Sequence, residues 1–348
     1  MATFFEYDCS INSTKSFGGE MQKLNKGDII DVVSPSSSSV RLGNSIELAK
    51  EKLTNMGYSV RFSENFSKCN TLNTSSIEDR INDLHKAFES SDSKAILTSI
   101  RGFSANQLLP YIDYELIKRS PKILCGYSDI TVLLNAIYAK TGLITFLGLH
   151  YSSFAMKKGF EYSENYFLKA LTQNEPYLIT HSEYWSDEAW FKDQENRNFI
   201  PTSGWKVYND GIADGELIGG NINSFYLLQG TEYLPCFENK IILLEFCSEV
   251  FKDASIYEFD RNLESLIQCK DFEKIKALVI GRFQQSSCVT EVLLLEVLNQ
   301  KPILKTIPVI YDFDIGHTTP MLTLPIGGRI KINTLEQSFL VYCDYFDN

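Results

Sequence analysis

The first 160 residues alternate short apolar runs with helical patterns, and this alternation constrains the fold more than any other feature. Runs with the length and composition of buried strands lie at 28–33, 58–62, 95–100 and 122–126. Helical patterns follow them at 44–56, 77–90, 107–117 and 129–141. Strands that alternate with helices form a mainly parallel sheet, and ligands bind beyond the carboxyl ends of its strands. We therefore predict an α/β N-terminal domain with a site at that edge.

The character of the sequence changes after about residue 155. Residues 161–205 are aromatic, acidic and irregular. Short strands are then predicted at 205–208, 240–244, 277–280, 309–311 and 329–332, with a helix near 255–268. This pattern divides the chain into an N-terminal domain (1–160), an aromatic linker or insertion (161–205) and a β-rich C-terminal domain (206–348).

Charge and cysteine usage exclude several classes of function. The net charge of −11 offers no basic surface for a nucleic acid polymer, which is bound through its phosphates. The eight cysteines form no C-x-x-C pair and the four histidines are scattered, so we expect free thiols and no metal. No apolar run approaches the roughly 20 residues of a membrane span. The N-terminus lacks the pattern of a signal peptide, and we expect a cytoplasmic protein that needs no membrane.

Ser128 stands in Cys-Gly-Tyr-Ser-Asp-Ile, between a predicted strand and a predicted helix. A nucleophile at such a point projects from a tight turn, and the amide of Asp129 points toward a developing oxyanion. The G-x-S-x-G pattern of a nucleophile elbow is absent because Ile130 stands where its second glycine would be. A serine here is also a common helix N-cap, so both roles are open.

Two residues at other strand ends complete a possible triad. His317 lies in a Gly/Thr/Pro loop after an apolar run, and Glu245 ends the run Ile-Ile-Leu-Leu-Glu. A general base needs contact with the nucleophile and a carboxylate on its second ring nitrogen. Alternatively, His317 is a surface residue and Glu245 projects into solvent at a strand tip. Glu249 is the competing acid.

Two glycine-containing segments are candidates for binding. Gly102 follows the predicted strand 95–100, where a glycine amide could supply a second oxyanion donor. Asn221 follows Gly219 and Gly220 in a predicted loop that begins a helix, and its amides and side chain could bind a carboxylate. A plain turn glycine and a helix cap are the structural alternatives.

Taken together, these segments resemble the S66 serine peptidases, the family of murein LD-carboxypeptidases and microcin C immunity hydrolases. The resemblance runs from about residue 27 to 328. It rests on Gly27-Asp-Ile-Ile, Ser34-Pro-Ser, Gly126-Tyr-Ser-Asp, Gly219-Gly-Asn, Leu244-Glu, Gly281-Arg-Phe, Gly316-His-Thr and Leu324-Pro-Ile-Gly. Residues 99–114 and the insertion 184–197 are similar to the microcin-immunity (MccF-like) branch. Arg101 departs from an expected Gly, and Leu149 from a usual Pro before His150.

The resemblance implies a fold, a mechanism and an assembly. The fold is a Rossmann-like N-terminal domain and a smaller β-rich α+β C-terminal domain, with the site between them. Ser128 is the nucleophile, His317 the general base and Glu245 its orienting acid, with the amides of Asp129 and Gly102 as the oxyanion hole. The family is usually dimeric, so a homodimer is expected, and no cofactor or metal is implied.

Three interpretations of the substrate follow. In the MccF-like one, the enzyme cleaves an amide in an aminoacyl or peptidyl nucleotide, and Trp185 and Trp190 stack on the base. Alternatively these aromatic residues only fix a long loop to the body. In the murein interpretation, a tetrapeptide loses its terminal D-Ala, and Asn221 or Arg282 holds a free carboxylate. The third is a catalytically silent binding protein on the same scaffold.

Overall fold

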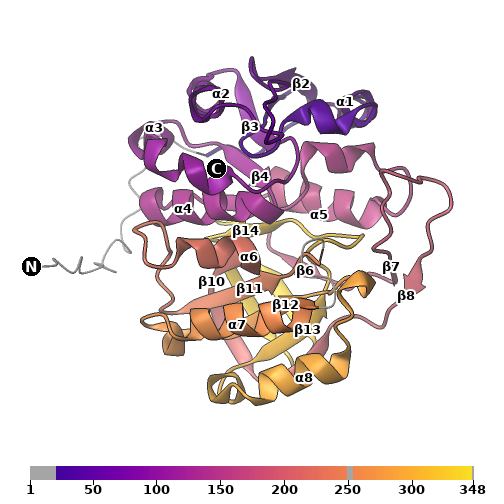
Figure 1. Cartoon of the computed structure of the whole chain (residues 1–348), viewed down its shortest axis with the longest axis vertical. Coiled ribbons are helices and arrows are strands. Elements are labelled where there is room, and N and C mark those ends of the chain that lie inside the picture. The colour runs from indigo at the N-terminus through magenta and orange to yellow at the C-terminus, as the bar shows by residue number, and fades with distance from the viewer. Residues whose placement is uncertain (1–20, 249–253, 347–348) are drawn as a thin grey trace, which may run out of the picture.

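The described chain forms two large sheets, with helices around and between them, and a small two-stranded ribbon (Figure 1). The computed structural model describes residues 21–248 and 254–346. The first sheet has the order β14-β5-β4-β3-β1-β2, in which β1 to β5 run parallel and β14 is antiparallel. Its strands are β1 (Ile29–Val33), β2 (Ser59–Phe62), β3 (Ser93–Thr98), β4 (Ile123–Gly126), β5 (Thr145–Leu147) and β14 (Leu324–Ile326). The predicted parallel α/β sheet is confirmed.

The helices of the first half follow the predicted alternation with two exceptions, the segment 107–117 and the segment 161–172, which is helical although an irregular insertion was expected there. These helices are α1 (Ser45–Asn55), α2 (Ile77–Glu89), α3 (Tyr114–Arg119), α4 (Thr131–Thr141) and α5 (Glu161–Thr172). The single helix predicted over 107–117 is wrong. A 3-10 turn that contains Pro110 occupies 105–111, and α3 starts afresh because Asp113 accepts a hydrogen bond from the amide of Leu116.

The second sheet has the order β6-β16-β15-β10-β11-β12-β13-β9. The strands β10 to β13 are parallel neighbours, and the outer pairs are antiparallel. Its strands are β6 (Tyr177–Ile179), β9 (Lys206–Asn209), β10 (Ile212–Asn221), β11 (Lys240–Glu245), β12 (Ala277–Gly281), β13 (Val309–Phe313), β15 (Arg329–Asn333) and β16 (Ser338–Val341). Helices α6 (Ile222–Phe225), α7 (Ser255–Ile267) and α8 (Glu291–Asn299) belong to this half, and β7 (Tyr184–Trp185) and β8 (Ile200–Pro201) form a separate ribbon.

The segment Gly219-Gly220-Asn221 is the end of β10 rather than the predicted loop. Both glycines have positive φ angles of 110° and 133°. A Cβ on Gly219 would lie 2.1 Å from the carbonyl oxygen of Leu243, and one on Gly220 would lie 2.6 Å from Oγ1 of Thr131. Glycine is therefore required because β10 approaches both β11 and the start of α4 too closely for a side chain.

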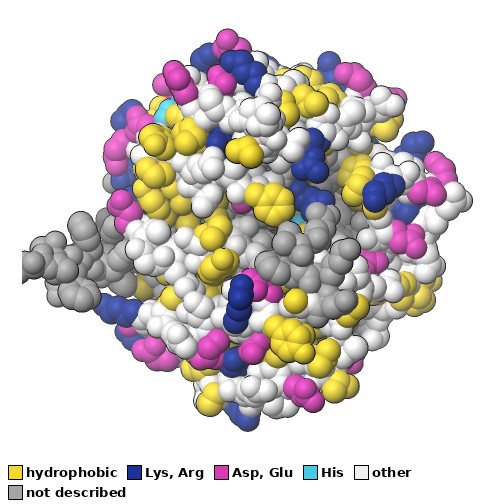
Figure 2. Space-filling view, viewed as in Figure 1, with side chains coloured by type: hydrophobic (Ala, Val, Ile, Leu, Met, Phe, Trp, Pro, Cys, Tyr) yellow, Lys and Arg dark blue, Asp and Glu magenta, His cyan; other side chains and the backbone are white. Residues whose placement is uncertain are grey.

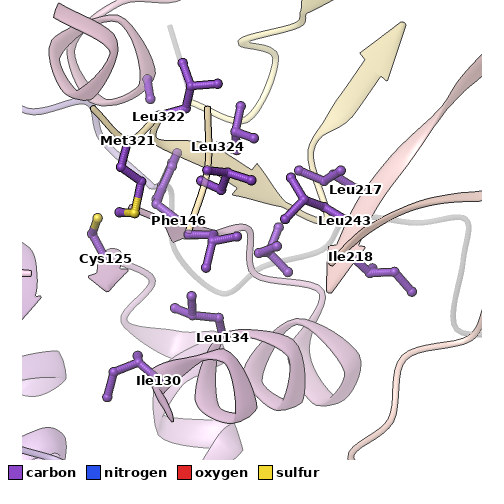
Figure 3. Packing of buried hydrophobic residues seen from close by; sticks show 14 of the residues in the cluster. Cys125, Ile130, Leu134, Phe146, Leu217, Ile218, Leu243, Met321, Leu322 and Leu324 are labelled. Carbon is purple, nitrogen blue, oxygen red and sulfur yellow. The ribbon is translucent and has the colours of Figure 1, made fainter. Parts of the chain in front are cut away.

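The two sheets share one hydrophobic core. Figure 3 shows Leu134 of α4 and Phe146 of β5 on one side, and Leu217 and Leu243 of the second sheet on the other. Helix α4 is buried on almost every face and packs against β5, β14 and β10. The strand β14, late in the sequence, completes the first sheet. This packing joins the halves of the molecule that carry the candidate site residues.

Within the described part of the chain, no helix is both long and apolar enough to cross a bilayer. Acidic and basic side chains are interspersed on the face seen in Figure 2, which shows no continuous basic patch.

Candidate active site

Ser128 lies in the tight turn between β4 and α4. It begins a short 3-10 turn (Ser128–Ile130) with a φ of +59°, a conformation that few residues other than glycine adopt. Neither this turn nor α4 is capped by its side chain, so the N-cap interpretation is wrong. Gly126 permits the approach of β3, because a Cβ there would lie 2.2 Å from Oγ1 of Thr98. The hydroxyl is thus held on a strained turn, as in a nucleophile elbow.

The structure brings the three side chains of the predicted triad together. Nε2 of His317 lies 3.0 Å from Oγ of Ser128, and Nδ1 lies 2.9 Å from Oε2 of Glu245. Glu245 ends β11 and is 1% exposed, so it does not project into solvent. Gly316 packs on it, since a Cβ there would lie 2.9 Å from Oε2. The competing acid Glu249 lies outside the described residues.

The surroundings of His317 favour the protonated form of its imidazole. Burial lowers its pKa, but the Cys247 and Glu245 side chains outweigh burial and raise the pKa well above that of an ordinary histidine. The ring of Tyr127 lies between two imidazoles, with its centroid 5.3 Å from that of His317 and 4.2 Å from that of His150. Burial lowers the pKa of His150, which leaves this second ring neutral.

Buried hydrogen bonds fix the second sheet to the helix that follows the nucleophile. The side chain of Asn135 on α4 donates to the carbonyl of Gly219 at 2.8 Å and accepts from its amide at 2.9 Å. Oγ1 of Thr131 accepts from the amide of Asn221 at 3.0 Å. These bonds set the position of the strand ends that carry Asn221 and Glu245 relative to Ser128.

Asn221 and Glu245 offer free polar atoms at the same edge. They are direct partners in the β10–β11 register. Nδ2 of Asn221 and Oε1 of Glu245 are buried, and neither has a hydrogen-bond partner within the described residues. A buried donor and a buried acceptor without partners are costly, and such atoms mark places where a ligand or water binds.

Gly102 lies against the serine-rich turn at residues 34–39. A Cβ on Gly102 would lie 2.1 Å from Oγ of Ser36 and 2.7 Å from the amide nitrogen of Ser37. The glycine is therefore required for a close approach rather than being an ordinary turn residue. Its amide and that of Asp129 remain the predicted oxyanion donors.

The aromatic insertion contacts the loop of His317. Backbone amides of Ser186 and Thr319 donate to each other's carbonyls at 2.7 Å, two residues beyond the imidazole. The ring of Trp185 lies over the guanidinium of Arg282, whose carbon is 5.3 Å from the ring centroid. Trp190 is half-buried like Trp185 and packs against the core. The pairing of Ser186, the neighbour of Trp185, with the His317 loop therefore favours Trp185 over Trp190 as a side chain that a ligand can contact.

The prediction that Arg282 holds a substrate carboxylate does not fit its position. Arg282 is 2% exposed, and its guanidinium donates to Asp312 at 2.8 Å and to Asp314 at 2.7 Å. Asp314 also accepts from the amide and hydroxyl of Ser182. Arg282 thus connects the strand ends of β12 and β13 with the aromatic insertion. Nothing in the sequence distinguished this internal ion pair from a free cation.

Comparisons with known proteins identify the family. Residues 30–148 match the model of the LD-carboxypeptidase N-terminal domain of peptidase S66, and residues 214–332 match the C-terminal domain. The chain belongs to the peptidase S66 family. It is therefore a serine hydrolase of the peptidase type.

Several S66 relatives are similar along nearly their whole length. YocD of Bacillus subtilis (strain 168), which is named as a carboxypeptidase, is 49% identical over 92% of this chain and 98% of the YocD chain. The microcin C7 self-immunity protein MccF of Escherichia coli is 33% identical over 88% of this chain and 91% of the MccF chain. An MccF-like protein from Bacillus anthracis superposes with a TM-score of 0.90 at 45% identity, covering 92% of this chain and 98% of its own. One MccF structure holds glutamyl sulfamoyl guanosine, with a TM-score of 0.85 at 29% identity over 94% and 99%.

The two residues that depart from the S66 pattern, Arg101 and Leu149, both make contacts within the described chain. Nη1 of Arg101 lies 3.8 Å from Sγ of Cys247, so its side chain reaches the segment that follows Glu245. Leu149 is buried, and its carbonyl accepts from the thiol of Cys125 at 3.5 Å. Among residues 21–248 and 254–346, no group of three or more His, Cys, Asp or Glu side chains could hold a metal ion.

Proposed function

We propose that this S66 protein hydrolyses an amide bond through a Ser128–His317–Glu245 triad, acting on aminoacyl or peptidyl nucleotides. The observation that carries the proposal is the chain of two contacts, 3.0 Å and 2.9 Å, that joins the hydroxyl, the imidazole and the carboxylate. In this arrangement His317 removes the proton of Ser128 as the hydroxyl attacks the carbonyl.

The remaining steps follow from the same groups. The imidazolium that forms is stabilised by Glu245 and then protonates the leaving nitrogen. Water hydrolyses the acyl-enzyme by the reverse use of His317. Asp129 and Gly102 amides would bind the oxyanion, and Asn221 would use its unpartnered Nδ2 to hold a polar group of the acyl part.

The likeness to MccF and the position of Trp185 support a nucleotide-bearing leaving group. MccF has been solved with aspartyl sulfamoyl adenosine as well as with the guanosine compound. Trp185 sits on the ribbon beside the His317 loop, where a base could stack on it. The alternative is a murein tetrapeptide carboxypeptidase that releases D-Ala, which matches the family description but uses no aromatic ribbon.

The deciding experiment offers both substrates to the purified enzyme. We expect the enzyme to cleave glutamyl or aspartyl sulfamoyl adenosine. Chromatography measures the sulfamoyl nucleoside that is released. A murein tetrapeptide is the matched competitor. Release of D-Ala without nucleotide cleavage would establish the murein alternative, and loss of neither compound would favour the silent binding protein.

Assembly and location are part of the same proposal. We expect a cytoplasmic homodimer, which light scattering of the purified protein would report as twice the 39.6 kDa mass of one chain. A mass of a single chain would contradict the assembly.

A further inference from the structure

Outside the triad, a buried polar cluster connects the nucleophile turn with the loop that carries Gly102. We define the oxyanion loop as residues 99–105 and the clamp as Ser36, Arg80 and Asp129. All three side chains are buried, with exposures of 0%, 2% and 4%. They come from the turn after β1, from α2 and from the residue that follows the nucleophile.

The Asp129 carboxylate is the centre of the clamp. Its Oδ2 accepts the hydroxyl of Ser36 and, at 2.9 Å, the amide of Ala105. The amide of Ser104 lies 3.5 Å from Oγ of Ser36. One carboxylate oxygen therefore holds the end of the oxyanion loop and, through Ser36, the surface against which Gly102 packs.

Arg80 fixes the other side of the same segments. Its Nη1 donates to the carbonyls of Pro35 at 3.2 Å and Ser104 at 3.0 Å, and its Nη2 donates to Oε1 of Gln107 at 2.8 Å. Burial lowers the pKa of Arg80, and the charge of Asp129 opposes this shift. The buried charges of Arg80 and Asp129 are thus opposite in sign and lie on two sides of the segments that they bind.

We propose that Ser36 and Asp129 are positioning residues that set the oxyanion loop against the nucleophile turn, with Arg80 as the balancing cation. The inference rests on the proposed hydrolase function. It assigns the Asp129 side chain a task separate from that of its backbone amide. An oxyanion donor acts only at 2.7–3.1 Å from the developing charge, so a loop that drifts loses transition-state binding rather than substrate binding.

The test compares Ser36→Ala with Ser39→Ala. Ser39 lies in the same turn and is equally buried, but its hydroxyl donates to the carbonyl of Phe66 at 2.8 Å instead of to Asp129. We expect Ser36→Ala to lower kcat about 10- to 100-fold, less than the 100- to 1,000-fold known for removal of a whole donor. KM should change by less than about twofold, and Ser39→Ala should keep the wild-type kcat, since transition-state contacts are lost only in the first variant.

The pH profile supplies a readout that a merely structural role would not move. Burial raises the pKa of Asp129, while Ser36, the amides of Ala105 and Ser104, and Arg80 lower it. Arg101 in the same loop reaches Cys247, and His317 and Glu245 lie beyond Ser128. Protonation of Asp129 removes a hydrogen-bond acceptor from the clamp. Activity should therefore fall at acid pH with the uptake of two protons, one by His317 and one by Asp129. Ser36→Ala should move the Asp129 break to higher pH, and Asp129→Asn should abolish it.

The outcomes separate this inference from the function on which it rests. An active Ser128→Ala enzyme would remove the proposed triad itself. If Ser128→Ala is inactive but Ser36→Ala matches Ser39→Ala in kcat and in pH profile, the hydrolase stands and the clamp is overturned. The clamp is also overturned if Ser36→Ala lowers kcat/KM only by raising KM, with kcat unchanged. Thermal unfolding of each variant shows whether Asp129→Asn is folded, and Ser36→Ala decides the matter if it is not.

Discussion

The side of the site that holds the proposed nucleophile, Ser128, and the side that holds the proposed base, His317, are built in different ways. Ser128 stands on one tight turn between β4 and α4, and its positive φ angle sets the direction of the side chain. Glu245 and His317 are 72 residues apart and meet only because β11 and β13 belong to one sheet. The orientation of the proposed nucleophile is therefore set by local backbone conformation, and that of the proposed base by tertiary packing of the second sheet.

The largest effect should come from the nucleophile side. Ser128→Ala removes the atom that forms the acyl-enzyme, and we expect kcat to fall about 10⁵- to 10⁶-fold, as in other triads. The positive φ of residue 128 tolerates serine and alanine similarly, so the thermal midpoint should stay within a few degrees. Kinetics with a sulfamoyl nucleotide and calorimetry on one preparation test both parts. An unchanged rate would show that the turn carries no nucleophile.

The base side is tested by Glu245→Gln, which keeps the shape of the acid and removes its charge. We expect kcat to fall about 10⁴-fold because the imidazole loses its orienting carboxylate. The charge of Glu245 contributes to the raised pKa of His317, so this pKa should fall in the variant. Because the neutral imidazole is the base, activity is lost as pH falls through this pKa, and the acid limb should move to lower pH.

A matched carboxylate sharpens the comparison. Glu216 lies at the other end of the β10–β11 pair, where it bonds with Lys240 and Tyr138. Glu216→Gln should leave the pH profile of kcat/KM in place. If both variants shift the profile equally, the effect belongs to the second sheet as a whole rather than to the contact with His317.

The same contrast explains what could be predicted from sequence. The strand, turn and helix around Ser128 have local signals, and the structure has them where the pattern placed them. By contrast, β10 contains Gly215, Gly219 and Gly220 among acidic residues, which hides its strand character. Its strand conformation comes from pairing with β11 and β15, which no local pattern records.

The candidate site residues show the same limit of prediction from sequence. The Ser128, Glu245 and His317 positions follow from strand ends together with family motifs. The role of Arg282 could not be predicted in this way. Its partners Asp312 and Asp314 lie on either side of Phe313, and this pattern of alternating polar and apolar residues is ordinary for a strand end. The clamp is hidden for a similar reason, since a serine-rich turn, a helix arginine and an aspartate meet only in the folded chain.

The smallest effect is expected at the aromatic insertion, where the two tryptophans give a matched pair. Trp185 lies on the Arg282 guanidinium beside the His317 loop, whereas Trp190 packs against the core. Base stacking contributes about 1–3 kcal/mol, so Trp185→Ala should raise KM for a sulfamoyl nucleotide about 5- to 150-fold with little change in kcat. Trp190→Ala should mainly lower the thermal midpoint. If both variants raise KM equally, the insertion has only a structural role. If Trp185→Ala raises KM as much for a short peptide as for the nucleotide, its ring does not contact a base.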